Sequence, residues 1–245
     1  MSQDRPNGGL WGSEPSKKDL FIGAFNDIHE ALKQKGGLTG QETFPVAFAA
    51  AVKRERWLSR FDKQLDILRD ARNYIEHTAL ESLPVAEPTD WAVSKIRALR
   101  SAILCPATIE EFTHGVKCGD AFSAASEVIG LMYEKSYSQI PIKCDDGRYR
   151  LLTTNTVTRW VAASMGKPLN FDTCVGDVLG FAEEAQVAVF LGRRTNLFQV
   201  LHEFESNPGL TAVLITESGQ DTQTPLGIIT VWDFPRVQAA ANYEH

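Results

Sequence analysis

A nine-residue pattern that occurs twice places polar side chains where they could bind an anion. Residues 151–159 and 228–236 each read as an apolar strand end, a Thr, two spacers, a second polar residue and, three residues later, an Arg. A strand that ends in Thr and runs into a helix N-terminus offers a hydroxyl and unpaired backbone N–H groups to a phosphate. An Arg one turn later can add positive charge toward the same anion. The pattern therefore predicts an anion site at each strand-to-helix junction.

The second polar residue of the pattern differs between the two copies. It is Asp233 in the second copy and Thr156 in the first. A carboxylate can accept hydrogen bonds from both hydroxyls of a ribose, whereas a single Thr hydroxyl cannot hold a diol in that way. We therefore expect a competent site at Thr230, Asp233 and Arg236, and a weak or empty one at Thr153 and Thr156. The alternative is that Thr230 and Asp233 only cap their helix, as such residues commonly do.

The elements around the two copies also repeat. A helical stretch and an apolar run precede each copy, at residues 123–142 and 197–215. Asp145-Asp146-Gly147 between two apolar runs is typical of a tight hairpin, and its counterpart at residues 217–225 is longer. The order predicts a β-α-β-β-α unit that occurs twice, and therefore an α+β fold in the C-terminal half.

This repeated unit resembles a CBS-domain pair, the tandem module that binds adenosine-containing nucleotides. The family motif Gly-apolar-apolar-Thr/Ser-x-x-Asp/Asn is complete from Gly227 to Asp233. The first copy has Arg150 in place of the Gly and Thr156 in place of the Asp. The family's Ser-x-Pro-Val segment is echoed at residues 138–142.

The resemblance covers about residues 104–240. It implies a first CBS repeat over residues 104–168 and a second over residues 169–240. It also implies that Thr230 and Asp233 hold the phosphate and the ribose of a regulatory adenine nucleotide, AMP, ATP or a similar molecule, with no other cofactor required.

The N-terminal half has helical signals. Residues 1–16 are polar and rich in Gly and Pro, which predicts a disordered tail. Apolar spacing over residues 17–103 predicts an all-α helical bundle. Its expected helices end at Gly36-Gly37, span Phe44 to Val52, span about residues 57–79, and run from Trp91 to Ile103 after a cap at Thr89 or Asp90.

Arg72 lies on the apolar stripe of the long third helix. It follows Leu65 by seven residues and Leu68 by four, so at 100° per residue it shares their face. The stripe consists of Leu58, Phe61, Leu65, Leu68 and Ile75. Because a guanidinium is always charged, this position requires a partner, a ligand or an interface.

Arg72-Asn73-x-x-x-His77 is similar to the Arg-x4-6-His motif of the HEPN superfamily, small helical bundles whose ribonuclease members carry it late in a helix. The resemblance implies a homodimer in which two Arg–His pairs line one cleft and cut RNA without a metal. His77 would take the proton of a ribose 2′-hydroxyl, Arg72 would stabilise the phosphoryl transition state, and Asn73 would orient His77 or hold a phosphate oxygen. The alternative is a structural ion pair between Arg72 and Glu76, four residues apart on the helix.

Composition and charge narrow the classes of function. No apolar run approaches the ~20 residues of a membrane helix, and no signal peptide is visible, so we expect a cytoplasmic protein. The four Cys have neither Cys-x-x-Cys spacing nor a His at ligand spacing, so we expect free thiols and no metal site. Residues 1–103 carry a net charge of +1 and residues 104–245 carry −7. This balance excludes a broad basic surface for nucleic acid, so any RNA contact must be local.

Two hypotheses follow from these motifs. In the first, the protein is a nucleotide-sensing ribonuclease in which the CBS pair regulates a metal-independent Arg/His site. In the second, it is a non-enzymatic nucleotide-binding regulator whose helical domain mediates dimerisation or binds a partner. A third possibility is a scaffold with neither activity.

Overall fold

The computed structural model describes residues 14–77, 79–80, 83–84, 86–183 and 187–241. Most of the predicted tail lies outside these residues. The chain divides into two compact units, residues 1–105 and 106–245, which are described separately.

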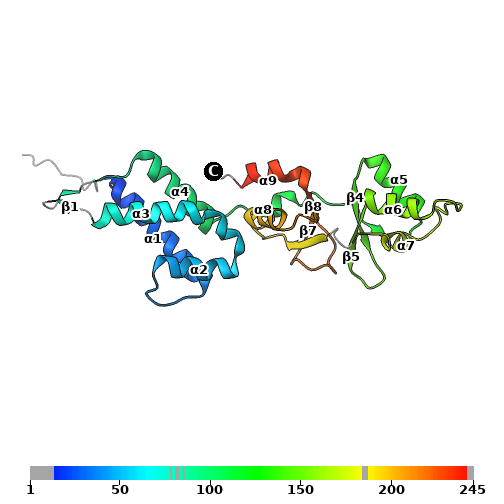
Figure 1. The fold of residues 1–245 in the computed structure, drawn as a ribbon, viewed down its shortest axis with the longest axis horizontal. Helices are drawn as coiled ribbons and strands as arrows, with labels where there is room; N and C mark the ends of the chain where they lie inside the picture. Colours follow the sequence, from blue (N-terminus) through cyan, green and yellow to red (C-terminus); the bar gives the residue numbers. More distant parts are fainter. Residues whose placement is uncertain (1–13, 78, 81–82, 85, 184–186, 242–245) are drawn as a thin grey trace, which may run out of the picture. The chain divides into compact units, whose positions relative to one another are not determined.

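Unit 1 is helical apart from two short strands. Its helices are α1 (Lys17–Gly36), α2 (Phe44–Arg54), α3 (Asp62–His77) and α4 (Asp90–Leu104). Strands β1 (Ala79–Leu80) and β2 (Leu83–Pro84) pair antiparallel, which the sequence pattern does not predict. Helix α1 contacts each of the other three helices and so forms the centre of the unit (Figure 1).

The predicted ends of two helices are confirmed by their caps. Helix α1 ends at Gly36, and Gly37 follows with φ of 70°, a left-handed conformation that a glycine adopts without strain. At the start of α4, the hydroxyl of Thr89 accepts a hydrogen bond from the Ala92 amide at 3.2 Å.

The prediction of a single helix over residues 57–79 is wrong. The segment begins with a 3-10 helix, η1 (Arg56–Phe61), and only then continues as α3. In a 3-10 helix, residues three apart lie above one another, so Leu58 and Phe61 both point into the core, together with Trp57. The apolar stripe itself is confirmed, because all five of its predicted residues are buried.

Unit 2 contains the predicted β-α-β-β-α order twice. The first copy consists of β3 (Gly119–Asp120), α5 (Ala125–Lys135), β4 (Gln139–Lys143), β5 (Tyr149–Thr153) and α6 (Thr154–Ala163). The second consists of β6 (Val187–Gly192), α8 (Leu197–Ser206), β7 (Leu210–Thr216), β8 (Gly227–Thr230), the 3-10 turn η3 (Val231–Asp233) and α9 (Phe234–Ala240).

Each copy forms its own three-stranded sheet, in the orders β3-β4-β5 and β6-β7-β8. The first two strands of each sheet are parallel and the last two antiparallel. The β4–β5 hairpin turns at Gly147 with φ of 78°. In Figure 1 the elements of the first copy lie together, as do those of the second.

Two short segments exchange between the copies. The 3-10 helix η2 (Ile109–Phe112) precedes the first copy, and helix α7 (Val175–Leu179) precedes the second. The Ile109 amide donates to the Thr195 carbonyl in the second copy, and the Val175 amide donates to the Ser123 carbonyl in the first, both at 2.9 Å. Each segment therefore bonds to the copy that it does not precede, and the two exchanges are equivalent by approximate twofold symmetry.

Candidate functional site

The second junction brings Thr230 and Asp233 together at the end of β8. The Thr230 amide and hydroxyl donate to Oδ2 of Asp233 at 2.8 and 2.9 Å. Both side chains are partly exposed, and the intervening Trp232 is one of the most exposed aromatic residues described. The arrangement is the helix cap that the alternative interpretation predicts, and it also leaves the carboxylate within reach of solvent.

Arg236 contacts the last residue of η2 and a residue that follows η2 in the sequence. Its guanidinium stacks 4.6 Å from the ring centroid of Phe112, and Nη2 lies 3.2 Å from Nε2 of His114. Both partners are more than one hundred residues earlier in the sequence. These contacts position Arg236 near the junction. They also engage its guanidinium, which we expect to face a phosphate.

The first junction is closed. Thr156 is fully buried, and Thr153 is only 7% exposed. The Thr153 hydroxyl accepts from the Thr156 amide at 3.1 Å, and the two hydroxyls lie 3.0 Å apart. The next Arg is also engaged, because Arg159 donates to the Phe181 carbonyl at 2.9 Å and pairs with Glu183 at 2.7 Å. The polar atoms of this copy therefore stabilise the fold and present no accessible diol acceptor.

The Gly at the start of the motif has a steric role in the second copy. A Cβ at Gly227 would overlap the carbonyl oxygen of Phe112. Gly227 pairs with Ile215, as Arg150 pairs with Ile142, so the two residues occupy equivalent positions. In the first copy, the side chain of Arg150 is accommodated at this position and pairs with Asp146 at 2.6 Å.

In unit 1, Arg72 has three described contacts. One Nη pairs with Glu76, the other donates to the Asn73 amide oxygen at 3.3 Å, and the guanidinium lies 6.0 Å from the ring centroid of Phe25. Nε is buried and has no hydrogen-bond partner among the described residues. The side chain of His77 lies outside the described residues. The structure thus brings Arg72 and Asn73 together, with Glu76 in the place that the ion-pair alternative predicts.

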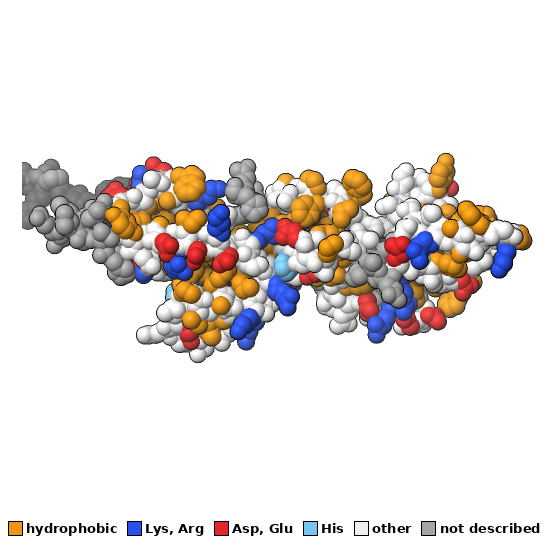
Figure 2. Space-filling model, viewed as in Figure 1, with side chains coloured by type: hydrophobic (Ala, Val, Ile, Leu, Met, Phe, Trp, Pro, Cys, Tyr) orange, Lys and Arg blue, Asp and Glu red, His pale blue; other side chains and the backbone are white. Residues whose placement is uncertain are grey.

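Other classes of site find no counterpart in the described parts of the chain. No cluster there of three or more His, Cys, Asp or Glu side chains could hold a metal ion. None of the described helices is both long and apolar enough to span a membrane. On the face drawn in Figure 2, Lys and Arg side chains are interspersed with Asp and Glu.

The sequence interpretation missed Phe112 and His114 as neighbours of the second junction. Their contact with Arg236 depends on the exchange of η2 between the copies, and nothing in residue spacing predicts that exchange. The one available signal was the Gly at position 227, which indicates that another part of the backbone approaches closely.

Comparisons with known proteins show a likeness at the level of structure. No family model and no curated protein sequence matches the chain. Similar solved structures include the CBS domain of a membrane protein from Sphaerobacter thermophilus (13% identity, 59% of this chain and 97% of that chain, TM-score 0.43). They also include a CBS-domain containing protein from Agrobacterium tumefaciens (12%, 54% and 98%, 0.39) and CBSX2 in complex with AMP (13%, 56% and 99%, 0.39). CBS-domain proteins are thus among the structural neighbours of about half of the chain.

Proposed function

We propose that this protein is a regulator that binds an adenine nucleotide at the junction of β8 and α9. The observation that carries the proposal is the partly exposed pair of Thr230 and Asp233, in contrast to the buried pair of the first copy. Both described hydrogen bonds of the Asp233 carboxylate end on Oδ2. A carboxylate has acceptor capacity beyond two bonds, so it can also receive the hydroxyls of a ribose.

Arg236 supplies the regulatory part of the proposal. To contact a bound phosphate, its guanidinium leaves the ring of Phe112 and the imidazole of His114. Both residues belong to the segment that follows α4, the last helix of unit 1, in the sequence. Nucleotide binding therefore changes the contacts of Phe112 and His114, near the start of unit 2. The coupling requires that the nucleotide bind more tightly when Arg236 is released.

Thermal denaturation with AMP or ATP tests the binding. A ligand that binds only the folded state raises the midpoint, by several degrees at concentrations far above Kd. We expect the increase in the wild type and its loss in Asp233→Asn, which keeps an oxygen acceptor for Thr230 but removes the charge. Asp172→Ala, an exposed carboxylate outside the junction, is the matched control and retains the increase. No increase with either nucleotide, or an undiminished one in Asp233→Asn, contradicts the proposal.

For unit 1 we propose a non-enzymatic role, dimerisation or partner binding. The ion pair with Glu76 places a negative charge beside the guanidinium of Arg72. That carboxylate opposes the approach of a phosphate, because like charges repel at short range. Arg72 then stabilises α3 through Glu76, Asn73 and the ring of Phe25.

Metal-independent ribonuclease activity of unit 1 is the second candidate. The unsatisfied Nε of Arg72, on the helix that also carries Asn73 and His77, favours it. Labelled RNA is incubated with the full chain and a chelator. The activity predicts cleavage that is lost in Arg72→Ala and in His77→Ala. The control is Arg69→Ala. Arg69 lies on the same helix, where it pairs with Asp66 and Asp70. Absence of cleavage by the wild type excludes ribonuclease activity, and the proposal of a non-enzymatic unit 1 then stands.

A further inference from the structure

Helix α2 of unit 1 exposes an apolar face. Its first nine residues, 44–52, are all Phe, Pro, Val or Ala. Three residues are buried where the helix packs on α1 and η1, namely Phe44, Ala47 and Ala51. Three residues of the opposite side are exposed, namely Pro45, Val46 and Ala49. On the face drawn in Figure 2, hydrophobic side chains gather over α2. A surface helix normally carries charged or polar side chains on its solvent side, so this face is suited to be covered.

The exposed residues form a stripe that is centred on Ala49. Pro45 and Lys53 lie four residues from Ala49, and Val46 and Val52 lie three residues from it. At 100° per residue, all four therefore flank Ala49 on the same side of the helix. The short side chain of Ala49 lets another helix approach the backbone closely. The stripe thus has the spacing of a helix–helix contact, with its smallest side chain at the centre.

The charges that flank α2 are opposite at its two ends. Glu42 precedes the helix, and its Oε2 is buried without a hydrogen-bond partner among the described residues. Three exposed cations lie at the other end, namely Lys53, Arg54 and Arg56. None of these cations has an ion pair or a hydrogen bond in the described part of the chain. Glu55 does not neutralise them, because its Oε2 already accepts from Lys35 and from Nε1 of Trp57, both at 3.0 Å.

We propose that this face binds the same face of a second copy of the chain, with the two α2 helices antiparallel. In a twofold contact, residue i meets residue j and residue j meets residue i. Glu42 and Arg56 each lie seven residues from Ala49, so an axis through Ala49 brings each Glu42 beside Arg56 of the other copy. A parallel arrangement would instead bring the cations of both copies together, and like charges repel. Charge complementarity therefore selects the antiparallel pair. The proposal rests on the non-enzymatic role of unit 1 and names its partner.

The size of α2 indicates a dimer that dissociates readily. The helix has 11 residues and is therefore about 16 Å long. A stable interface buries roughly 1,600 Å² in total, and one pair of helices of this length covers less. The aliphatic stem of Lys53 adds apolar contact by lying over Val46 of the other copy. We expect an equilibrium between monomer and dimer that shifts with protein concentration.

Sedimentation velocity of the full chain over a range of concentrations tests the proposal. We expect the wild type to change from monomer to dimer as the concentration rises. Ala49→Arg places a long cation at the twofold axis and raises the dimer Kd by about tenfold or more. The substitution suits an exposed helix position, because Arg has a high helix propensity. Ala98→Arg, at an exposed position of α4, is the matched control and leaves the dimer Kd unchanged.

Charge reversal tests the antiparallel arrangement. Glu42→Lys and Arg56→Glu each place like charges opposite one another, so each alone weakens the dimer several-fold. The double variant re-forms the pair with its charges exchanged and returns the dimer Kd to within about twofold of the wild-type value. A residue that only stabilises its own unit gives no such rescue.

Three results would overturn the proposal. The first is a wild type that stays monomeric at every concentration. The second is a dimer that Ala49→Arg leaves intact, which places the contact on another face. The third is a double charge variant that dimerises no better than the single variants. RNA cleavage by the wild type would contradict the non-enzymatic role of unit 1, whereas sedimentation reports the α2 contact itself, so the two failures are distinguishable.

Discussion

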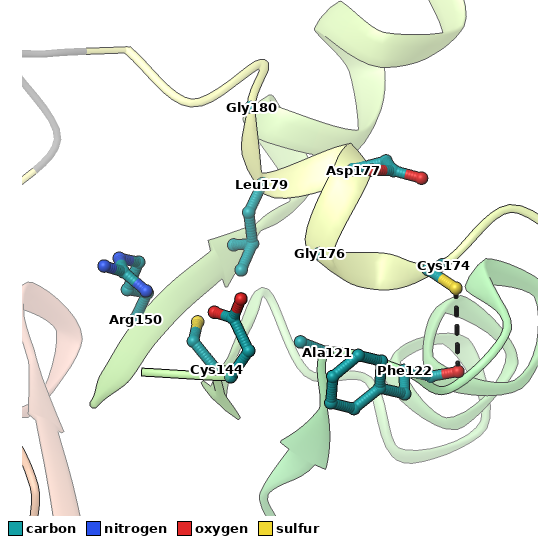
Figure 3. A pocket seen from close by; sticks show the side chains of 10 residues that line it. Ala121, Phe122, Cys144, Arg150, Cys174, Gly176, Asp177, Leu179 and Gly180 are labelled. Atoms are coloured by element: carbon teal, nitrogen blue, oxygen red, sulfur yellow. Dashed lines mark hydrogen bonds between the residues drawn. The ribbon is translucent and has the colours of Figure 1, made fainter. Parts of the chain in front are cut away.

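The two copies of the β-α-β-β-α unit share a hydrogen-bond frame but place their accessible polar groups differently. The second copy presents Thr230 and Asp233 at the end of β8, and its Arg193 pairs with Glu110 and Glu217. The first buries Thr153 and Thr156, and a cavity of about 520 Å³ lies beside its Ala121, Cys144 and Gly176 (Figure 3). Duplication of a fold therefore does not duplicate its site. A few side chains at equivalent positions decide where a ligand can enter.

The largest expected effect comes from giving the first copy the carboxylate of the second. Thr156→Asp places a charge at a fully buried position, next to the hydroxyl of Thr153. We expect it to lower the free energy of unfolding by about 3 kcal/mol or more, because a carboxylate at a fully buried position loses its hydration. Denaturant unfolding measures the change.

Thr156→Ser keeps the hydroxyl and is the control, with an expected loss of about 1 kcal/mol. A stable Thr156→Asp variant that binds a second nucleotide would break the comparison. It would mean that the identity of one residue, and not burial, separates the two junctions.

The next effect concerns the glycine at the start of the motif. Gly227→Ala forces the backbone of Phe112 away, since the added Cβ would overlap its carbonyl oxygen. We expect a loss of about 2 kcal/mol in the free energy of unfolding, within the range for overpacked sites. At the equivalent position of the first copy, Arg150→Gly is expected to cost less than half as much. Equal losses would contradict the steric difference between the copies.

The smallest effect concerns the imidazole that contacts Arg236. His114 is exposed, and its removal frees the guanidinium from one of its two described contacts. We expect His114→Ala to tighten nucleotide binding two- to threefold, the equivalent of about 0.5 kcal/mol. His202→Ala, on α8, is the control. Weaker binding by His114→Ala would show that His114 serves the ligand directly and does not restrain Arg236.

The local features of the fold could be predicted from the sequence. The end of α1 at Gly36, the cap at Thr89 and the hairpin at Gly147 follow from residues whose backbone preferences act over a few positions. The repeated element order follows from the register of apolar and polar residues. The break between η1 and α3 did not follow, because a 3.6-residue and a 3-residue period are hard to distinguish over six residues.

The contacts that separate the two junctions could not be predicted. The burial of Thr156 depends on how α6 packs on its sheet. The residues next to Thr156 in the sequence do not determine that packing. The stacking of Arg236 on Phe112 joins residues more than one hundred positions apart through the exchanged segment. Likewise, the cavity beside Ala121, Cys144 and Gly176 depends on which segments of unit 2 the fold brings together, and residue spacing does not show that.

Isothermal titration calorimetry of the full chain with AMP and with ATP tests the central claim most directly. It measures both affinity and the number of nucleotides bound per chain. The account predicts one nucleotide per chain, with binding lost in Asp233→Asn and retained in Thr153→Ser. Two nucleotides per chain, or one that Asp233→Asn still binds with unchanged affinity, would contradict the assignment of the site to the second copy.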